Sequence, residues 1–256
     1  MNFKEYLSRE ELSASGLKKL ARSPAYFKWC KENEQKDTKA MIIGKATHSA
    51  ILTPDIFKKE YACAPECDRR TKLGKETFEA FSIANVGKEI LSKEDYDHCV
   101  AISESVLKSP KIRNMLSKGE AEKSFFFEID GVKMKARLDF VSPDAIVDIK
   151  TTSDADAFSF AKDCINLGYD MQMAVYQEAV RQHTGNSLPV VILAVEKDAN
   201  LDYAIFQMGQ DWLDLGMRKV KKLLAVYKDC LEKDEWPGYA KNVQALVLPS
   251  WVKIEE

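Results

Sequence analysis

The stretch Val132-Lys133-Met134-Lys135-Ala136-Arg137-Leu138-Asp139-Phe140 alternates apolar and polar residues over its whole length. Successive side chains of a β-strand point to opposite faces, so this pattern predicts a strand with one buried face and one polar face. Asp130-Gly131 is a strong hairpin signal that joins it to an earlier strand, residues 124–129. The turn Ser142-Pro143-Asp144 leads into a third strand, residues 145–150. The sequence therefore predicts a three-stranded β-meander.

Helix and strand patterns extend outward from the meander. Ser13 is a candidate N-cap for a helix that ends near Pro24, and Pro54 ends another helix over residues 41–52. We further expect irregular structure over 60–75, strands over 189–195 and 203–208, and helices over 74–90, 93–108, 110–117, 157–183 and 210–232. This order predicts a mixed α+β (α/β) fold, with a central mixed sheet flanked by helices. We expect one domain over residues 1–256, with a mainly helical part (1–120), a core (121–210) and a C-terminal helix and tail (211–256).

The composition is that of a globular protein of ordinary charge. Hydrophobic residues make up 45% of the 256 residues and charged residues 30%. No apolar stretch approaches the roughly 20 residues of a membrane helix, and no signal-peptide pattern opens the chain, so we expect a cytoplasmic protein without a membrane partner. Lys and Arg total 38 against 40 Asp and Glu. This balance argues against a protein that coats nucleic acid through overall positive charge, although a local basic strip remains compatible with a DNA enzyme.

Two carboxylates and a lysine are expected to converge at the meander. Asp139 lies on the polar face of its strand, and Asp148 shares a face with Lys150 on the next strand. The turn between these strands brings both aspartates to neighbouring strand ends. Carboxylates bind Mg²⁺, and two such ions roughly 3.5–4 Å apart can stabilise the attacking and leaving oxygens of a phosphodiester. A nearby lysine can orient or help deprotonate a water molecule, and the carbonyl of Ile149 is a further candidate ligand. The alternative is a solvated charged face with a surface ion pair.

Two helical motifs accompany this cluster. The first is Gly44-Lys45-Ala46-Thr47-His48, where His48 is a candidate metal or phosphate ligand or simply a core histidine. The second is Gln172-Met173-Ala174-Val175-Tyr176, where Gln172 and Tyr176 share a helix face. Alone, this pair is equally compatible with an ordinary core tyrosine.

Taken in order, Gly-x-x-x-His, a strand-ending Asp, Asp-hydrophobe-Lys and Gln-x-x-x-Tyr resemble the RecB-type branch of the PD-(D/E)xK nucleases. The resemblance is closer to the RecE (exonuclease VIII) nuclease domain and its phage-encoded relatives, and it spans roughly residues 10–210. Each motif is loose, whereas the ordered set is specific. The resemblance implies a PD-(D/E)xK, restriction-endonuclease-like core. It is carried by residues 44–54, 131–139, 148–152, 169–176 and the stretch 68–75.

The resemblance also implies roles for individual residues. Asp139 and Asp148 would bind metal, Lys150 would orient or help deprotonate the water, and His48 would be an additional metal-site residue. Glu122 matches an acidic residue that such nucleases supply from the helix before the meander. Gln172 and Tyr176 would support the site or contact DNA. The second acidic position is Asp148 where Glu is commoner, as the RecE group itself allows.

The activity implied by the resemblance is Mg²⁺-dependent exonuclease digestion of double-stranded DNA ends. Digestion would run 5′ to 3′, Mn²⁺ would substitute for Mg²⁺, and the 3′ single strand would pass to a RecT-like single-strand annealing protein. Relatives form rings, so a trimeric or tetrameric ring-shaped homo-oligomer is expected. The 210–232 helix and the Trp236–Trp251 tail are then candidate interface elements, or they pack on their own chain. Alternatives are a single-strand exonuclease, an endonuclease or a non-catalytic DNA-end-binding scaffold.

Two further features bear on DNA and metal binding. A basic run is the first candidate for phosphate contacts, ahead of the polar face of the meander strand, or it is a charged surface loop. In order of preference these DNA-binding candidates are Arg69, Arg70, Lys72 and Lys75, followed by Lys133, Lys135 and Arg137. Some related nucleases hold an iron–sulfur cluster with a tight cysteine group after the core, where this chain has only Cys230. We therefore expect reduced thiols and no iron–sulfur cluster, with a metal at Cys63 and Cys67 as the alternative.

Overall fold

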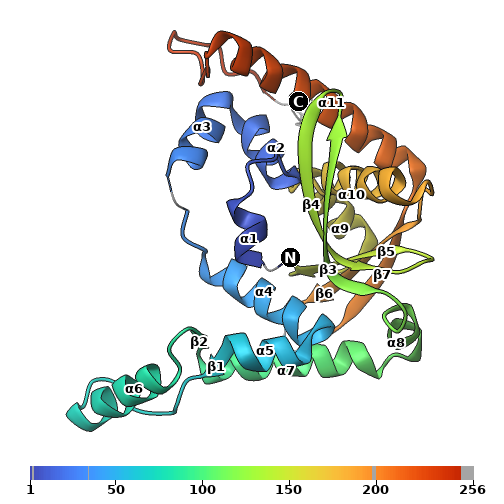
Figure 1. Cartoon of the computed structure of the whole chain (residues 1–256). Helices are drawn as coiled ribbons and strands as arrows, with labels where there is room; N and C mark the ends of the chain where they lie inside the picture. Colours follow the sequence, from blue (N-terminus) through green and yellow to red (C-terminus); the bar gives the residue numbers. More distant parts are fainter. Residues whose placement is uncertain (2, 34, 198–199, 249–256) are drawn as a thin grey trace, which may run out of the picture.

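The computed structural model describes residues 1, 3–33, 35–197 and 200–248 (Figure 1). Its helices are α1 (Phe3–Ser8), α2 (Ala14–Arg22), α3 (Pro24–Glu32), α4 (Lys39–Leu52), α5 (Pro54–Glu60), α6 (Lys72–Ala84), α7 (Lys93–Lys108), α8 (Pro110–Met115), α9 (Ala157–Asn166), α10 (Tyr169–Thr184) and α11 (Gln210–Lys233). Its strands are β1 (Tyr61–Cys63), β2 (Glu89–Leu91), β3 (Glu120–Ile129), β4 (Val132–Val141), β5 (Ile146–Thr152), β6 (Val190–Glu196) and β7 (Tyr203–Met208). Within the described ranges, no helix has the length and apolar character needed to cross a membrane.

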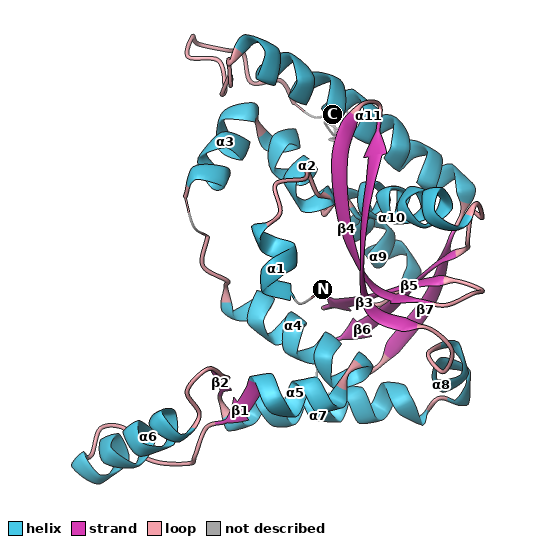
Figure 2. Ribbon diagram, viewed as in Figure 1, coloured by secondary structure: helices cyan, strands magenta, loops and turns pink. Residues whose placement is uncertain are grey.

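A five-stranded mixed sheet forms the centre of the molecule, in the order β3-β4-β5-β6-β7 (Figure 2). The predicted meander is confirmed as β3, β4 and β5, which pair antiparallel. β6 then runs parallel to β5 over seven residue pairs, from Ile146–Val190 to Thr152–Glu196, and β7 closes the sheet antiparallel to β6. The parallel pair requires the long crossover that α9 and α10 supply. The predicted mixed α+β fold with a helix-flanked central sheet is therefore confirmed.

Helices cover both faces of this sheet. The side chains of β6 show this, because they alternate between two apolar clusters. Val190 and Ile192 face the larger cluster, to which α2, α3, α9, α10 and α11 contribute. Leu193 and Val195 face a second cluster, formed with α4, α7 and α8. A strand buried on both faces lacks the polar alternation of β4, which explains the nearly continuous apolar run of β6.

Two predicted helices differ from those in the structure, one because it is divided and the other because it is shorter. The single helix expected over 157–183 is two helices, because Gly168 adopts a left-handed conformation (φ +64°) that turns the chain between α9 and α10. The helix expected over 74–90 stops at Ala84, and β2 follows it. β2 pairs in parallel with β1, and β1 lies inside the region 60–75 that was expected to be irregular. Strands of three residues are too short to show a period, so the sequence pattern could not reveal this small sheet.

Residues 64–88, which connect β1 to β2 and contain α6, form an arm that projects from the body of the protein (Figure 1). The only buried residue of α6 is Gly74, whose added Cβ would meet the Asp68 carbonyl oxygen at 2.0 Å. Leu73 and Ile83 are exposed. The arm is therefore stabilised mainly by its own turns and caps, such as the Thr71 side chain that accepts from the Gly74 N–H.

Helices α10 and α11 cross at Gly216, where two backbones come into contact. A Cβ at this position would lie 2.1 Å from the Asp170 carbonyl oxygen, and the Asp170 carboxylate is buried and paired with Lys219 at 2.5 Å. This packing buries the apolar face of α11 within the chain, and Trp236, which follows α11, stacks on Phe27 of α3. Helix α11 and Trp236 thus pack on their own chain, whereas Tyr239, Val243 and Leu246 of the tail are exposed, and a role in assembly stays a prediction. Trp251 lies outside the described residues.

We expect Gly216→Ala to lower the free energy of unfolding by about 2–3 kcal/mol, because a methyl group cannot fit without separating α10 from α11. The matched control is Gly44→Ala in α4, where the nearest atom outside the helix, Thr151 Oγ1, lies 3.8 Å from the added Cβ. That change should stabilise by about 0.5–1 kcal/mol, since alanine favours a helix interior. Urea denaturation of both variants compares the two positions, and equal effects would contradict the close crossing.

Candidate active site

The candidate site lies where β4 and β5 separate. These strands pair only at Phe140–Val147 and Val141–Ile146, so the next residues along each strand leave the ladder. The backbone N–H of Ile149 instead donates to Asp139 Oδ2 at 2.8 Å. From α4, His48 Nδ1 lies 3.3 Å from the same carboxylate oxygen. The separation of the strands therefore makes room for Asp139 between a backbone donor and an imidazole.

Asp148 and Lys150 form a buried ion pair beside this group. Lys150 Nζ lies 2.6 Å from Asp148 Oδ2, and the Asp148 residue is 0% exposed. Apart from this ammonium ion, neither carboxylate oxygen of Asp148 has a hydrogen-bond partner among the described residues. A buried carboxylate normally accepts several hydrogen bonds, so Asp148 keeps unused capacity for a positively charged ligand.

Protonation in this cluster follows from burial and mutual charge. Burial and the neighbouring Asp139 raise the pKa of Asp148 to about 6, although Lys150 opposes this shift. Burial acts on Asp139 in the same direction, but His48, Lys150 and the Ile149 N–H outweigh it and hold its pKa below the ordinary value. Burial disfavours the charged form of His48, yet Asp139 raises its pKa. The pKa of Lys150 is also raised, because Asp148 and Asp139 outweigh burial. Lys150 is therefore an ammonium ion at neutral pH.

The donor set suits a hard divalent cation, although it is not arranged as a finished cage. Carboxylate oxygens are the ligands that Mg²⁺ and Mn²⁺ prefer, whereas an imidazole is more typical of softer transition-metal ions. No three His, Cys, Asp or Glu side chains in the described ranges already surround a common point. A cation would therefore compete with His48 and Lys150 for the two aspartates. At Ile149 the described contact is the N–H to Asp139, and a role for its carbonyl stays a prediction.

Glu122 joins the site from β3, so the expectation of a preceding helix was wrong. It lies between Ala121, which pairs with Phe140, and Lys123, and its backbone is left-handed (φ +55°). A non-glycine residue in this conformation is uncommon, and here it turns the side chain toward Arg137, whose Nε lies 2.7 Å away. Burial and the charge of Asp139 raise the pKa of Glu122. Glu122 is thus electrostatically linked to Asp139.

Gln172 and Tyr176 lie together on α10, as predicted, and line the inner wall of the site. Gln172 Nε2 donates to Tyr176 Oη at 2.8 Å. Burial, followed by the charges of Asp148 and Asp139, raises the pKa of Tyr176 far above its ordinary value. Lys18 of α2 donates to Gln172 Oε1 at 3.0 Å and was not predicted from the sequence. In the sequence Lys18 is followed directly by Lys19, and such residues usually form the solvated face of an amphipathic helix.

The predicted basic residues divide into two groups. Those of the run at 69–75 belong to the α6 arm, and the structure does not bring them to the aspartates. Lys135, in contrast, is buried, and its Nζ donates to the carbonyls of Tyr6, Leu7 and Arg9. Arg137 is held by Glu122 and Ser124. The expectation that Lys135 faces DNA was therefore wrong, because its ammonium ion binds the carbonyl end of α1.

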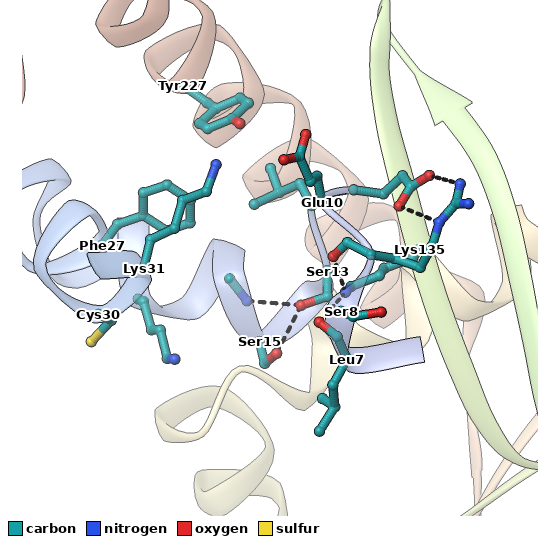
Figure 3. A pocket seen from close by; sticks show the side chains of 15 residues that line it. Leu7, Ser8, Glu10, Ser13, Ser15, Phe27, Cys30, Lys31, Lys135 and Tyr227 are labelled. Atoms are coloured by element: carbon teal, nitrogen blue, oxygen red, sulfur yellow. Dashed lines mark hydrogen bonds and ion pairs between the residues drawn. The ribbon is translucent and has the colours of Figure 1, made fainter. Parts of the chain in front are cut away.

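A large cavity lies apart from the aspartates. It measures about 400 Å³ and is bounded by α1, α2, α3 and α11 (Figure 3). Lys31, Ser15 and Tyr227 line it, whereas Asp139, Asp148 and Lys150 do not. A smaller cavity of about 90 Å³ adjoins the site, since its walls include Arg137, Gln172 and Tyr176. The ionic cluster therefore lies outside this large cavity and beside the smaller one.

Comparison with known proteins gives a family and a fold. Residues 13–249 match the family described as "PDDEXK-like domain of unknown function (DUF3799)". A crystal structure of a candidate exonuclease from Eubacterium rectale is similar with a TM-score of 0.69 and 20% sequence identity, covering 97% of this chain and 95% of that one. A phage-related exonuclease from Haemophilus somnus 129PT aligns with a TM-score of 0.38 and 15% identity over 91% of this chain and 100% of that one. A comparison with curated proteins gave no match.

Proposed function

The chain belongs to the family of this PDDEXK-like domain, and on that premise we propose that it is a Mg²⁺-dependent nuclease that digests double-stranded DNA from its ends. The observation that carries the proposal is that the pairs Asp139–His48 and Asp148–Lys150 lie side by side where β4 and β5 separate. The ordered motifs of a PD-(D/E)xK nuclease thus converge in one site. Digestion from ends is supported by the description of the Eubacterium rectale protein, which shares the fold, as a candidate exonuclease.

The residues of the site divide the chemistry of phosphodiester hydrolysis among them. Asp139 and Asp148 would hold Mg²⁺, with His48 beside them. Bound Mg²⁺ would polarise the phosphate oxygens and favour ionisation of a water molecule. Lys150, an ammonium ion, presents a positive charge and hydrogen-bond donors to the water or the phosphate. Tyr176 remains a neutral donor, because its pKa is far above neutral. The ionic cluster thereby supplies charge stabilisation from preorganised groups.

The finer specificity follows the resemblance to the RecE group. We propose digestion in the 5′-to-3′ direction, which leaves a 3′ single strand for a RecT-like annealing protein, and assembly into a ring-shaped homo-oligomer. A ring would enclose the duplex and so keep a chain of formal net charge −2 on its substrate. Arg69 and Arg70 on the α6 arm would add phosphate contacts away from the site.

The decisive assay is digestion of linear duplexes labelled at the 5′ or the 3′ end, with Mg²⁺ and with EDTA. We expect Mg²⁺-dependent release of mononucleotides beginning at the 5′ end, and no cleavage of a closed circular duplex. Cutting of the circle would instead indicate an endonuclease. A chain that binds ends and releases nothing would be a scaffold, and either result would overturn the proposal.

We expect Arg70→Ala to weaken binding to duplex DNA several-fold and to reduce its salt dependence, because an exposed guanidinium contributes mainly by displacing counterions from phosphates. The measurement is fluorescence anisotropy at several salt concentrations in EDTA. Arg113→Ala is the control, since that guanidinium donates to the Leu107 and Lys108 carbonyls at the far end of α7. Unchanged binding by Arg70→Ala would move the phosphate contacts away from the arm.

A further inference from the structure

Lys18 lies beside the site and is a positive charge without an ionic partner among the described residues. Four carboxylates around the site have a basic side chain as partner: Asp139 with His48, Asp148 with Lys150, Glu122 with Arg137, and Asp170 with Lys219. The hydrogen-bond acceptor described for Lys18 Nζ is the neutral amide oxygen of Gln172. In the part of the chain that the structure describes, none of these four pairs includes Lys18.

The Lys18 side chain is nonetheless held in place. Its aliphatic stem lies over Gly168, where an added Cβ would stand 3.4 Å from Lys18 Cε and 3.5 Å from Cγ. Its Nζ lies 5.0 Å from the centroid of the Tyr169 ring. Lys150 Nζ lies 4.8 Å from the same centroid. One aromatic ring thus positions two ammonium ions, of which only Lys150 has a carboxylate partner among the described residues.

This arrangement is electrostatically unfavourable for the protein alone. Burial, followed by the like charge of Lys150, lowers the pKa of Lys18 to about 8, although Asp148 and Asp170 oppose the shift. A lysine with only a structural role would gain by turning toward solvent or toward a carboxylate. Groups held in a costly arrangement are commonly kept for a ligand, and the ligand that suits an unpaired cation is an anion.

We propose that Lys18 binds a phosphate group of the DNA backbone at the active site, as a second cation that α2 places beside Lys150. This inference rests on the proposed function and deepens it. The amide of Gln172 positions Lys18, which gives the Gln172–Tyr176 pair a specific role, since Tyr176 fixes the amide and the amide fixes the ammonium ion. The contact reads the charge of the backbone and carries no base specificity.

The test compares Lys18→Met, Lys18→Arg and the matched control Lys19→Met, which removes a charge from the adjacent residue of α2 that faces the large cavity. The probe is a fluorescein-labelled duplex in EDTA, with anisotropy measured from about 50 to 200 mM salt. We expect Lys18→Met to weaken binding about tenfold and to reduce the slope of log K against log salt by about 1. Lys18→Arg should retain most of the affinity, and Lys19→Met should keep the wild-type slope.

Thermal unfolding separates a ligand contact from a structural role. Since Lys18 carries an uncompensated charge, we expect Lys18→Met to unfold at the wild-type temperature or above it. A lower unfolding temperature together with an unchanged salt slope would overturn the inference and make Lys18 a structural residue. Failure of the wild-type chain to bind duplex DNA would overturn the proposed function as well. Binding by the wild type with an unchanged slope in Lys18→Met overturns the Lys18 contact alone.

Discussion

Asp148→Asn is expected to reduce the rate of DNA cleavage by at least about 10³-fold, a loss of about 4 kcal/mol of transition-state stabilisation. The change preserves the shape of the side chain and removes the charge that a divalent cation requires. Asp148 is fully buried, and the only ion-pair or hydrogen-bond partner described for its oxygens is the Lys150 ammonium ion. No other described carboxylate is placed to substitute for it, since Asp139 is held by His48 and Ile149. The measurement is the initial rate of nucleotide release in saturating Mg²⁺.

Stability should hardly change in the same variant. Asp148 is costly to the fold at neutral pH, because burial and Asp139 both disfavour its charged form. The Lys150 ammonium ion loses its partner but keeps the favourable charge of Asp139, so the two effects offset and we expect the free energy of unfolding to stay within about 1 kcal/mol of the wild type. Asp163→Asn in α9, which alters a carboxylate near Thr152, is the control and should keep full activity. Substantial cleavage by Asp148→Asn would remove Asp148 from the proposed metal site.

Lys150→Met is expected to abolish cleavage and, unlike Asp148→Asn, to destabilise the protein. The side chain is 12% exposed, and its removal leaves the buried Asp148 carboxylate without an ion-pair or hydrogen-bond partner among the described residues. Breaking a buried ion pair from one side typically costs about 3–5 kcal/mol. We expect a loss of about 3 kcal/mol at pH 8, measured by urea denaturation, together with loss of nucleotide release.

The loss in Lys150→Met should depend on pH in a defined direction. The folded-state pKa of Asp148 is about 6, above the unfolded value near 3.8, so the folded state binds the proton more tightly. The associated stability is fully present below the unfolded pKa and is lost as pH rises through the folded pKa. Without Lys150 that pKa rises further, so the variant should approach wild-type stability near pH 5 and fall below it between about pH 6 and 8. Adding Asp148→Asn should remove this pH dependence, and a pH-independent loss would contradict the buried-pair interpretation.

Much of the site is predictable from the sequence because its residues follow strand geometry. Period-two alternation and the turn at 142–144 place Asp139, Asp148 and Lys150 on one patch, and the helix expected over 41–52 contains His48. Glu122 is different, since a left-handed residue inside a strand leaves no pattern in the sequence and a helix is expected in its place. Alternation also assigns Lys135 to DNA, because it reveals the face of a strand but not the α1 helix that covers it.

The features that the sequence does not reveal depend on contacts between distant segments. Lys18 meets Gln172 across more than half of the chain, so no local motif connects them. The division between α9 and α10 depends on Gly168, whose significance is conformational, since many glycines occur within helices. The parallel pairing of β5 with β6 likewise follows from tertiary packing, because the composition of β6 does not specify its neighbour.

That parallel pairing determines when the site can form during folding. Beyond Val147, β5 is held by β6 rather than by β4, and the partners of Asp148 and Lys150 in β6 are Ile192 and Ala194. A chain that has folded only its meander lacks the strand that fixes both side chains. Non-local parallel pairs form late, because closing the crossover costs chain entropy before the strand contacts can stabilise it. The charged cluster should therefore assemble among the last steps of folding, and a partly synthesised chain would have no organised hydrolytic centre.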